Sequence, residues 1–107
     1  MSTSFKFIKT KVEMISKVTT RPMFGYQCFS INKKFFVGFS NKNNFQVIVR
    51  LSKEEQKKAI LTSGIKPFSH GAKMGWIEIN AKQVNASAAF RWITRAYNYA
   101  KKLAKSS

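Results

Sequence analysis

The spacing of apolar residues at the start of the chain predicts a helix. They recur at intervals of three and four, the period of one helical face, at Phe5, Ile8, Val12 and Ile15. Pro22 disfavours helical backbone at the residue before it. We therefore expect this first helix to end by Thr19 or Thr20.

Strands are predicted to follow this helix. Three segments are rich in Phe and Val: from about Arg21 to Ile31, from Lys34 to Ser40, and from Phe45 to Arg50. Short Asn-containing stretches separate them at residues 32–33 and 41–44, and Asn suits turns because it tolerates left-handed backbone. The pattern predicts an antiparallel meander of three strands.

Alternation within these segments indicates which side chains share a sheet face. Successive side chains of a strand point to opposite faces. In the second segment we expect one face to hold Phe35, Val37 and Phe39. In the third we expect one face to hold Phe45, Val47 and Val49.

The second half of the chain opens with a helix-start signal. Ser52 and Glu55 form a capping box, in which the hydroxyl accepts from the third residue's N–H and the Glu reaches back. We expect this helix to end near Gly64, since glycine favours the position after a helix. Residues 65–75 are predicted to be mostly loop, and residues 76–80 a fourth strand.

The last helix gives the clearest periodicity. It is predicted to start near Asn85, a favourable N-cap, and to run to about Lys105. Its expected buried stripe consists of Ala89, Ile93, Ala96, Ala100 and Leu103.

The order of elements predicts an α+β fold. Helix, three strands, helix, strand and helix would give two layers, with helices packed on an antiparallel sheet of about four to five strands. The length suits one domain over residues 1–107, and we expect no second domain.

The net charge of the chain indicates its class of partner more clearly than any motif does. Lys and Arg number 20, the four acidic residues are all Glu, and the net charge is +16. A small domain usually carries a net charge of about 2–8 in magnitude. Because self-repulsion of this size destabilises a compact state, the chain is expected to meet a polyanion, such as nucleic acid or an anionic membrane.

The remaining composition indicates a folded protein inside the cell. Apolar residues make up 44% of the chain, whereas a disordered basic tail would have few of them. We therefore expect a folded domain with a hydrophobic core. A single cysteine allows no internal disulfide and fits a reducing compartment. With no continuous apolar leader or span in the sequence, we expect a cytoplasmic protein, nucleoid-associated if it binds DNA.

Residues suited to catalysis are few and scattered. His70 is the only histidine and is expected in an exposed loop, while Cys28 is expected to be a small buried hydrophobe. Glu54 and Glu55 fall in the first turn of a predicted helix, where the helix dipole favours acidic side chains. Glu78 is expected to be exposed. We therefore expect no enzyme activity, no metal, no cofactor and no small-molecule substrate.

Basic residues form a second stripe on the last helix. The stripe has helical spacing, includes one Asn, and consists of Arg91, Arg95, Asn98, Lys102 and Lys105. Lys101 lies beside it. No acid occurs after residue 80, which removes salt bridges within the helix as an explanation. Two interpretations stay open, a solvated outer face and a surface that follows phosphates.

Other side chains extend the candidate surface. Lys33, Lys34 and Lys42 lie at predicted hairpin turns, and Lys73 could meet a phosphate from the loop. Trp92 is expected to be buried against the sheet, while Tyr99 could be buried or stack on a base.

Several short motifs resemble those of one family. Arg21-Pro22-Met23-Phe24-Gly25 resembles the Arg-x-Met-Phe-Gly opening of the TfoX/Sxy N-terminal domain. That family's later segments are similar to three stretches of this chain: Lys66-Pro67-Phe68, Gly71-x-x-Met74 and Trp76-Ile77-Glu78-Ile79. Trp92 matches the aromatic residue in the family's closing helix. The resemblance spans roughly Val12 to Leu103. It implies a compact α/β domain, in which Met23, Phe24 and Gly25 are expected to set the strand and core.

The resemblance also implies regulation, since longer relatives act as transcriptional co-activators of natural competence. Together with the charge, it leads us to expect a non-enzymatic domain that binds nucleic acid, DNA more than RNA, as a chromatin-like or transcription-regulatory factor. The expected phosphate contacts are Arg91, Arg95, Lys101, Lys102 and Lys105, with Lys33, Lys34 and Lys73 secondary. The alternative is a module that binds an acidic protein partner.

Overall fold

A computed structural model describes residues 5–15, 17–40 and 46–106 and confirms the α+β architecture. Six strands form one antiparallel sheet in the order β1-β2-β3-β4-β6-β5. The elements are α1 (Phe5–Glu13), β1 (Val18–Met23), β2 (Tyr26–Ile31), β3 (Lys34–Ser40), β4 (Gln46–Arg50), α2 (Lys53–Ala59), β5 (Ile65–Pro67), η1 (Ala72–Met74), β6 (Trp76–Asn80) and α3 (Ala86–Ser106). The helix named η1 is a single 3₁₀ turn.

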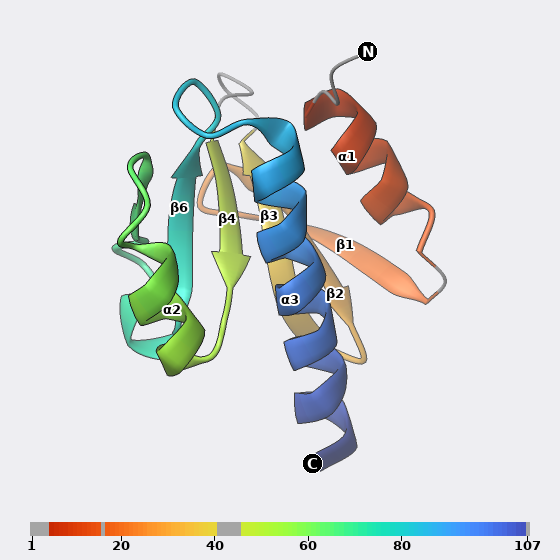
Figure 1. Cartoon of the computed structure of the whole chain (residues 1–107). Coiled ribbons are helices and arrows are strands. Elements are labelled where there is room, and N and C mark those ends of the chain that lie inside the picture. Colours follow the sequence, from red (N-terminus) through yellow and green to blue (C-terminus); the bar gives the residue numbers. More distant parts are fainter. Residues whose placement is uncertain (1–4, 16, 41–45, 107) are drawn as a thin grey trace.

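The helices lie on one face of the sheet, as Figure 1 shows. α3 packs along β3, β2 and β4, and α1 packs beside it. One hydrophobic core joins Ile8 of α1, Ala59 of α2 and Ile93 of α3 to sheet residues such as Phe29 and Val49. The opposite sheet face therefore has no helix packed against it among the described residues.

The first predicted strand is in fact a hairpin. β1 and β2 pair antiparallel, and the residues between them, Phe24 and Gly25, have φ angles of 56° and 81°. Two positive φ angles are typical of the tight turns that match the twist of paired strands. Phe24 is 61% exposed at this turn, so the expectation that it belongs to the core is wrong.

A β-bulge changes the face on which one aromatic residue lies. Phe29 of β2 pairs with Val37 of β3, yet the next residue, Ser30, pairs with Phe35. Phe36 is the extra residue, and it is buried with Val37 and Phe39 under α3. Phe35 consequently lies on the opposite face, where a strict alternation had wrongly grouped it with Val37 and Phe39.

Other element boundaries also differ from the prediction. Residues 65–75 contain the edge strand β5 and the turn η1 rather than only loop. α1 ends at Glu13, because residues from Val18 onward pair with β2, and α2 ends at Ala59. Phe45 lies outside the described residues, whereas Val47 and Val49 share the core face as predicted.

Side-chain N-caps are present at the start of α2 and α3, although the Glu55 carboxylate, which was expected to reach back to Ser52, pairs with Arg95. The Asn85 side chain accepts a hydrogen bond from the Ala88 N–H at 2.8 Å, which starts α3. Ser52 Oγ accepts from the Glu55 N–H at 3.2 Å, which starts α2. Within the described ranges, none of the helices has the length and apolarity that crossing a bilayer requires.

Candidate functional site

The outer face of α3 carries the predicted basic stripe. Arg91, Arg95, Lys101 and Lys102 are all exposed. The side chain of Lys105, near the end of the helix, lies outside the described part of the structure. The periodicity of the sequence therefore placed the described members of this stripe correctly.

Part of this stripe meets acids from another helix. Arg95 forms an ion pair of 3.2 Å with Glu55 of α2, and its guanidinium lies 5.2 Å from the Trp92 ring centroid. Glu54 and Glu55 line the groove between α2 and α3 together with Lys102. The acids absent from α3 itself are thus supplied by α2, so Arg91 and Lys101 are better placed than Arg95 to meet a phosphate.

The C-terminal half of α3 lies beside one end of the sheet (Figure 1). Tyr97 packs edge-on against Phe36 of β3, with ring centroids 5.4 Å apart. Lys101 Nζ lies 5.4 Å from the Tyr97 centroid, and the Arg50 guanidinium lies 6.0 Å from the Tyr99 centroid.

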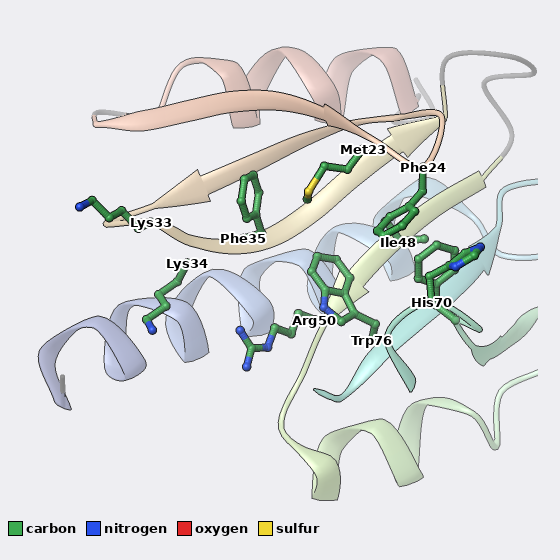
Figure 2. Close-up of a pocket in the computed structure, with 10 residues that line it drawn as sticks. Met23, Phe24, Lys33, Lys34, Phe35, Ile48, Arg50, His70 and Trp76 are labelled. Carbon is green, nitrogen blue, oxygen red and sulfur yellow. The ribbon is translucent and has the colours of Figure 1, made fainter. Parts of the chain in front are cut away.

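The β2–β3 turn, which carries Lys33 and Lys34, lies at the same end (Figure 1 and Figure 2). We use the name basic end for four residues from the turn, two strands and the helix: Lys33, Lys34, Arg50 and Lys101. The sequence analysis named Lys33, Lys34 and Lys101 as candidate phosphate contacts and did not name Arg50, the last residue of β4.

A further candidate, Lys73, lies on another element. Lys73 is exposed in η1, which packs against β6. The carbonyl of its neighbour Ala72 accepts hydrogen bonds from Lys53 Nζ and Gln56 Nε2 of α2. Lys42 lies outside the described residues.

Glu78 is not the exposed residue that alternation predicted. Its side chain is 17% exposed and pairs with Lys66 of β5, with 3.4 Å between Nζ and Oε1. Gln46 Nε2 donates to the same oxygen at 3.5 Å, and the Tyr26 hydroxyl donates to Gln46 Oε1 at 3.3 Å. Burial first, and then the nearby Glu78 charge, raise the pKa of Tyr26 above its ordinary value.

The cysteine and the histidine lie where they were expected. Cys28 is fully buried, and burial raises the pKa of its thiol from 9.0 to about 11, which keeps it protonated at neutral pH. His70 is exposed and stacks on Phe24, with ring centroids 4.7 Å apart and ring planes at 8°. Among residues 5–15, 17–40 and 46–106, no group of three His, Cys, Asp or Glu side chains gathers as a metal site would require.

A pocket on the sheet face that the helices leave open was not predicted. This sheet-face pocket has a volume of about 280 Å³. Its floor and walls come from Ile48 of β4, Met23 of β1, Phe35 of β3, Trp76 of β6 and Phe68. Its rim carries Lys33, Lys34, Arg50, Phe24 and His70.

Figure 2 shows that the pocket has two chemically different ends. The cationic groups of Lys33, Lys34 and Arg50 lie toward the left, Phe24 and His70 lie toward the right, and the rings of Phe35 and Trp76 lie between them. None of the residues lining the pocket is acidic. Arg50 is held in place, because its Nε donates to the Met74 carbonyl at 3.3 Å.

One sequence signal could have indicated this pocket. In β4 and β6, Ile48 and Trp76 occupy positions that alternate with core residues such as Val49 and Ile77. Apolar side chains on both faces of strands that have helices on one side only indicate a second apolar cluster on the other side. Phe35 gave no such signal, because the bulge reversed its orientation.

Comparison with known proteins gives the same fold and a family. A protein of Deinococcus radiodurans with a DUF419 domain superposes with a TM-score of 0.75 at 11% identity, covering 91% of this chain and 80% of that one. A Pseudomonas syringae protein solved by structural genomics gives 0.68 at 14% identity, covering 89% and 96%. No curated protein matches the sequence. The family model for the TfoX N-terminal domain matches residues 11–100, and the chain therefore belongs to the TfoX N-terminal domain family.

Proposed function

We propose that this chain is a non-enzymatic domain that binds nucleic acid, DNA in preference to RNA, through backbone phosphates. The observation that carries the proposal is the excess of cations. At most four of the 20 Lys and Arg residues can pair one to one with the four carboxylates. Neutralising phosphates and releasing their counterions would relieve the repulsion among the others.

The surface that fits this role best is the basic end together with Arg91. The basic end lies around the C-terminal half of α3 and the adjoining end of the sheet, and Arg91 is exposed on the N-terminal half of the same helix. Phosphate contacts of this kind fix position and carry no sequence information directly, so we propose binding with little sequence preference. Within the TfoX N-terminal family, such a domain would act as a small regulatory factor on nucleic acid.

A fluorescence-anisotropy titration tests the proposal. A short duplex of random sequence and its single strand are titrated at several salt concentrations. We expect log affinity to fall linearly with log salt, with a slope of about 0.9 per phosphate neutralised on the duplex. Absence of binding at low salt would exclude the proposal and favour an acidic protein as the partner.

A matched pair of charge reversals locates the surface. Arg91→Glu with Lys101→Glu should weaken duplex binding and reduce the salt slope by about 1 for each phosphate that is no longer neutralised. The control, Lys6→Glu with Lys57→Glu, changes net charge equally at exposed positions on α1 and α2. Equal weakening in both variants would show that total charge alone drives binding, and the surface assignment would then be wrong.

A further inference from the structure

We propose that the sheet-face pocket binds one unpaired nucleotide, with the base against Phe35 and Trp76 and the phosphate at the cationic rim. This inference rests on the proposed function and names the part of nucleic acid that the open sheet face recognises. The occupant is a nucleotide in a single strand or a free nucleotide, since both present the same ring and phosphate.

The first argument is the chemistry of the lining. A flat aromatic ligand gains stacking energy on the Phe35 and Trp76 rings. Every nucleic-acid base has a flat aromatic face and can stack on such side chains. An anionic ligand is favoured by Lys33, Lys34 and Arg50 in a pocket without a lining carboxylate. A neutral apolar ligand would make no use of these cations, and an acidic peptide would make little use of the rings.

The second argument is the arrangement of these groups. Lys34 and Arg50 end on one side of the Phe35 and Trp76 rings, while Lys33 points away from the rings on that same side (Figure 2). A base on the rings would therefore direct its phosphate toward Lys34 and Arg50. The volume of about 280 Å³ lies at the lower limit of small-ligand pockets, which suits a single base. A paired base inside a duplex cannot stack on a protein ring, whereas unpaired bases stack on sheet aromatics in established single-strand modules.

The third argument is backbone strain at the rim. Phe24 and Lys33 have φ angles of 56° and 68°, where glycine or asparagine would be less strained. Each lies in a two-residue turn, β1–β2 for Phe24 and β2–β3 for Lys33, and each lines the pocket. A large aromatic and a lysine at such positions are unfavourable for folding, and their strain points to a function at this rim.

Quenching of tryptophan fluorescence tests the inference. A Trp92→Phe background leaves Trp76 as the only reporter. The probes are a single-stranded DNA of about six nucleotides, the same sequence as RNA, a blunt duplex and adenosine 5′-monophosphate. We expect saturable quenching by the single strands and no quenching of Trp76 by the duplex. Saturable quenching by the mononucleotide alone would assign the pocket to a free nucleotide, whereas no saturable quenching by any probe would overturn the inference.

Substitutions in the lining separate stacking from charge. Phe35→Ala should weaken binding of the single strand by roughly 5- to 150-fold, the range expected for one base stack. The control Phe7→Ala removes a phenyl ring that is 51% exposed on α1 and should leave the affinity unchanged. Equal affinity of Phe35→Ala and the parent protein would overturn the inference.

Two further variants remain informative if Phe35→Ala unfolds. Lys33→Gly and Phe24→Asn relieve the left-handed backbone at exposed positions, so both should fold. Both should nevertheless bind the single strand more weakly than the parent protein. Unchanged affinity in both would contradict a role of the rim in binding.

The outcome is separable from that of the proposed function. If the pocket inference fails, duplex binding and its dependence on Arg91 and Lys101 remain. If the proposal of a phosphate-binding surface is wrong, duplex binding is absent at low salt. Quenching of Trp76 by the mononucleotide then still reports on the pocket alone.

Discussion

At the residue scale, two glycines with positive φ are required for different reasons. Gly25 has a φ of 81° at the β1–β2 turn, and a Cβ there would meet open space. Gly75 has a φ of 94°, and a Cβ there would run into the carbonyl oxygen of Leu51. The Leu51 N–H donates to the Gly75 carbonyl at 3.0 Å, so the two segments cannot separate without losing this bond.

The same substitution at these two glycines should therefore have unequal effects. Gly25→Ala introduces only the left-handed backbone cost, about 1–2 kcal/mol. Gly75→Ala adds a collision with backbone, so we expect a loss of at least about 3 kcal/mol in the free energy of unfolding. Urea denaturation followed by far-UV circular dichroism measures both values. Equal losses would show that the chain between Leu51 and Gly75 moves apart easily.

Burial of individual residues was predictable where one physical factor dominates. Cys28 is buried because a small apolar side chain packs readily in an apolar cluster, here with Tyr26 and Ile48. Glu78 and Phe24 were wrongly placed, because each depends on a partner distant in sequence, Lys66 for the carboxylate and His70 for the ring. Local sequence carries no record of such contacts.

At the element scale, prediction was best for α3 and weakest around β3. α3 combines a side-chain N-cap with a regular buried stripe, and both are local signals. The β1–β2 turn contains Phe-Gly rather than Asn-Gly, so the local sequence indicates one strand where the structure has a hairpin. The bulge at Phe36 is set by pairing with β2, and it moves Phe35 from the expected core to the pocket. The chemistry of that pocket therefore escaped sequence reasoning.

The cap of α3 gives a prediction at this scale. Asn85→Ala should lower the free energy of unfolding by about 1 kcal/mol, because the Ala88 N–H loses its acceptor, and Asn85→Gly by only a few tenths. Asn98→Ala is the matched control, an exposed position inside the same helix, where alanine has the higher helix propensity. Thermal and urea denaturation measure the three variants. A loss in Asn98→Ala as large as in Asn85→Ala would contradict the assignment of the cap.

At the scale of the whole molecule, the fold brings Lys33, Lys34 and Arg50 together at one pocket, and the four carboxylates can neutralise few of the 20 cations. Glu55 and Glu78 form ion pairs with Arg95 and Lys66, and these pairs use two of the four carboxylates. The helices occupy one sheet face, and the basic end joins the outer side of α3 to the rim of the open face. A strand of nucleic acid could thus contact both surfaces through Arg50, which lies against α3 and also lines the pocket.

Self-repulsion at a net charge of +16 makes the stability of the protein dependent on salt. The Debye length falls from about 30 Å at 0.01 M to about 8 Å at 0.15 M, so added NaCl screens repulsion between surface cations. We expect Tm to rise over this range, and to rise less in Lys6→Glu with Lys57→Glu, whose net charge is lower by four. An excess of single-stranded DNA at low salt should raise Tm further, since a ligand that binds only the folded state stabilises it. Differential scanning fluorimetry measures each shift. A Tm that falls with added salt would mean that attractive ion pairs outweigh the repulsion, and the charge argument for a polyanionic partner would lose its physical basis.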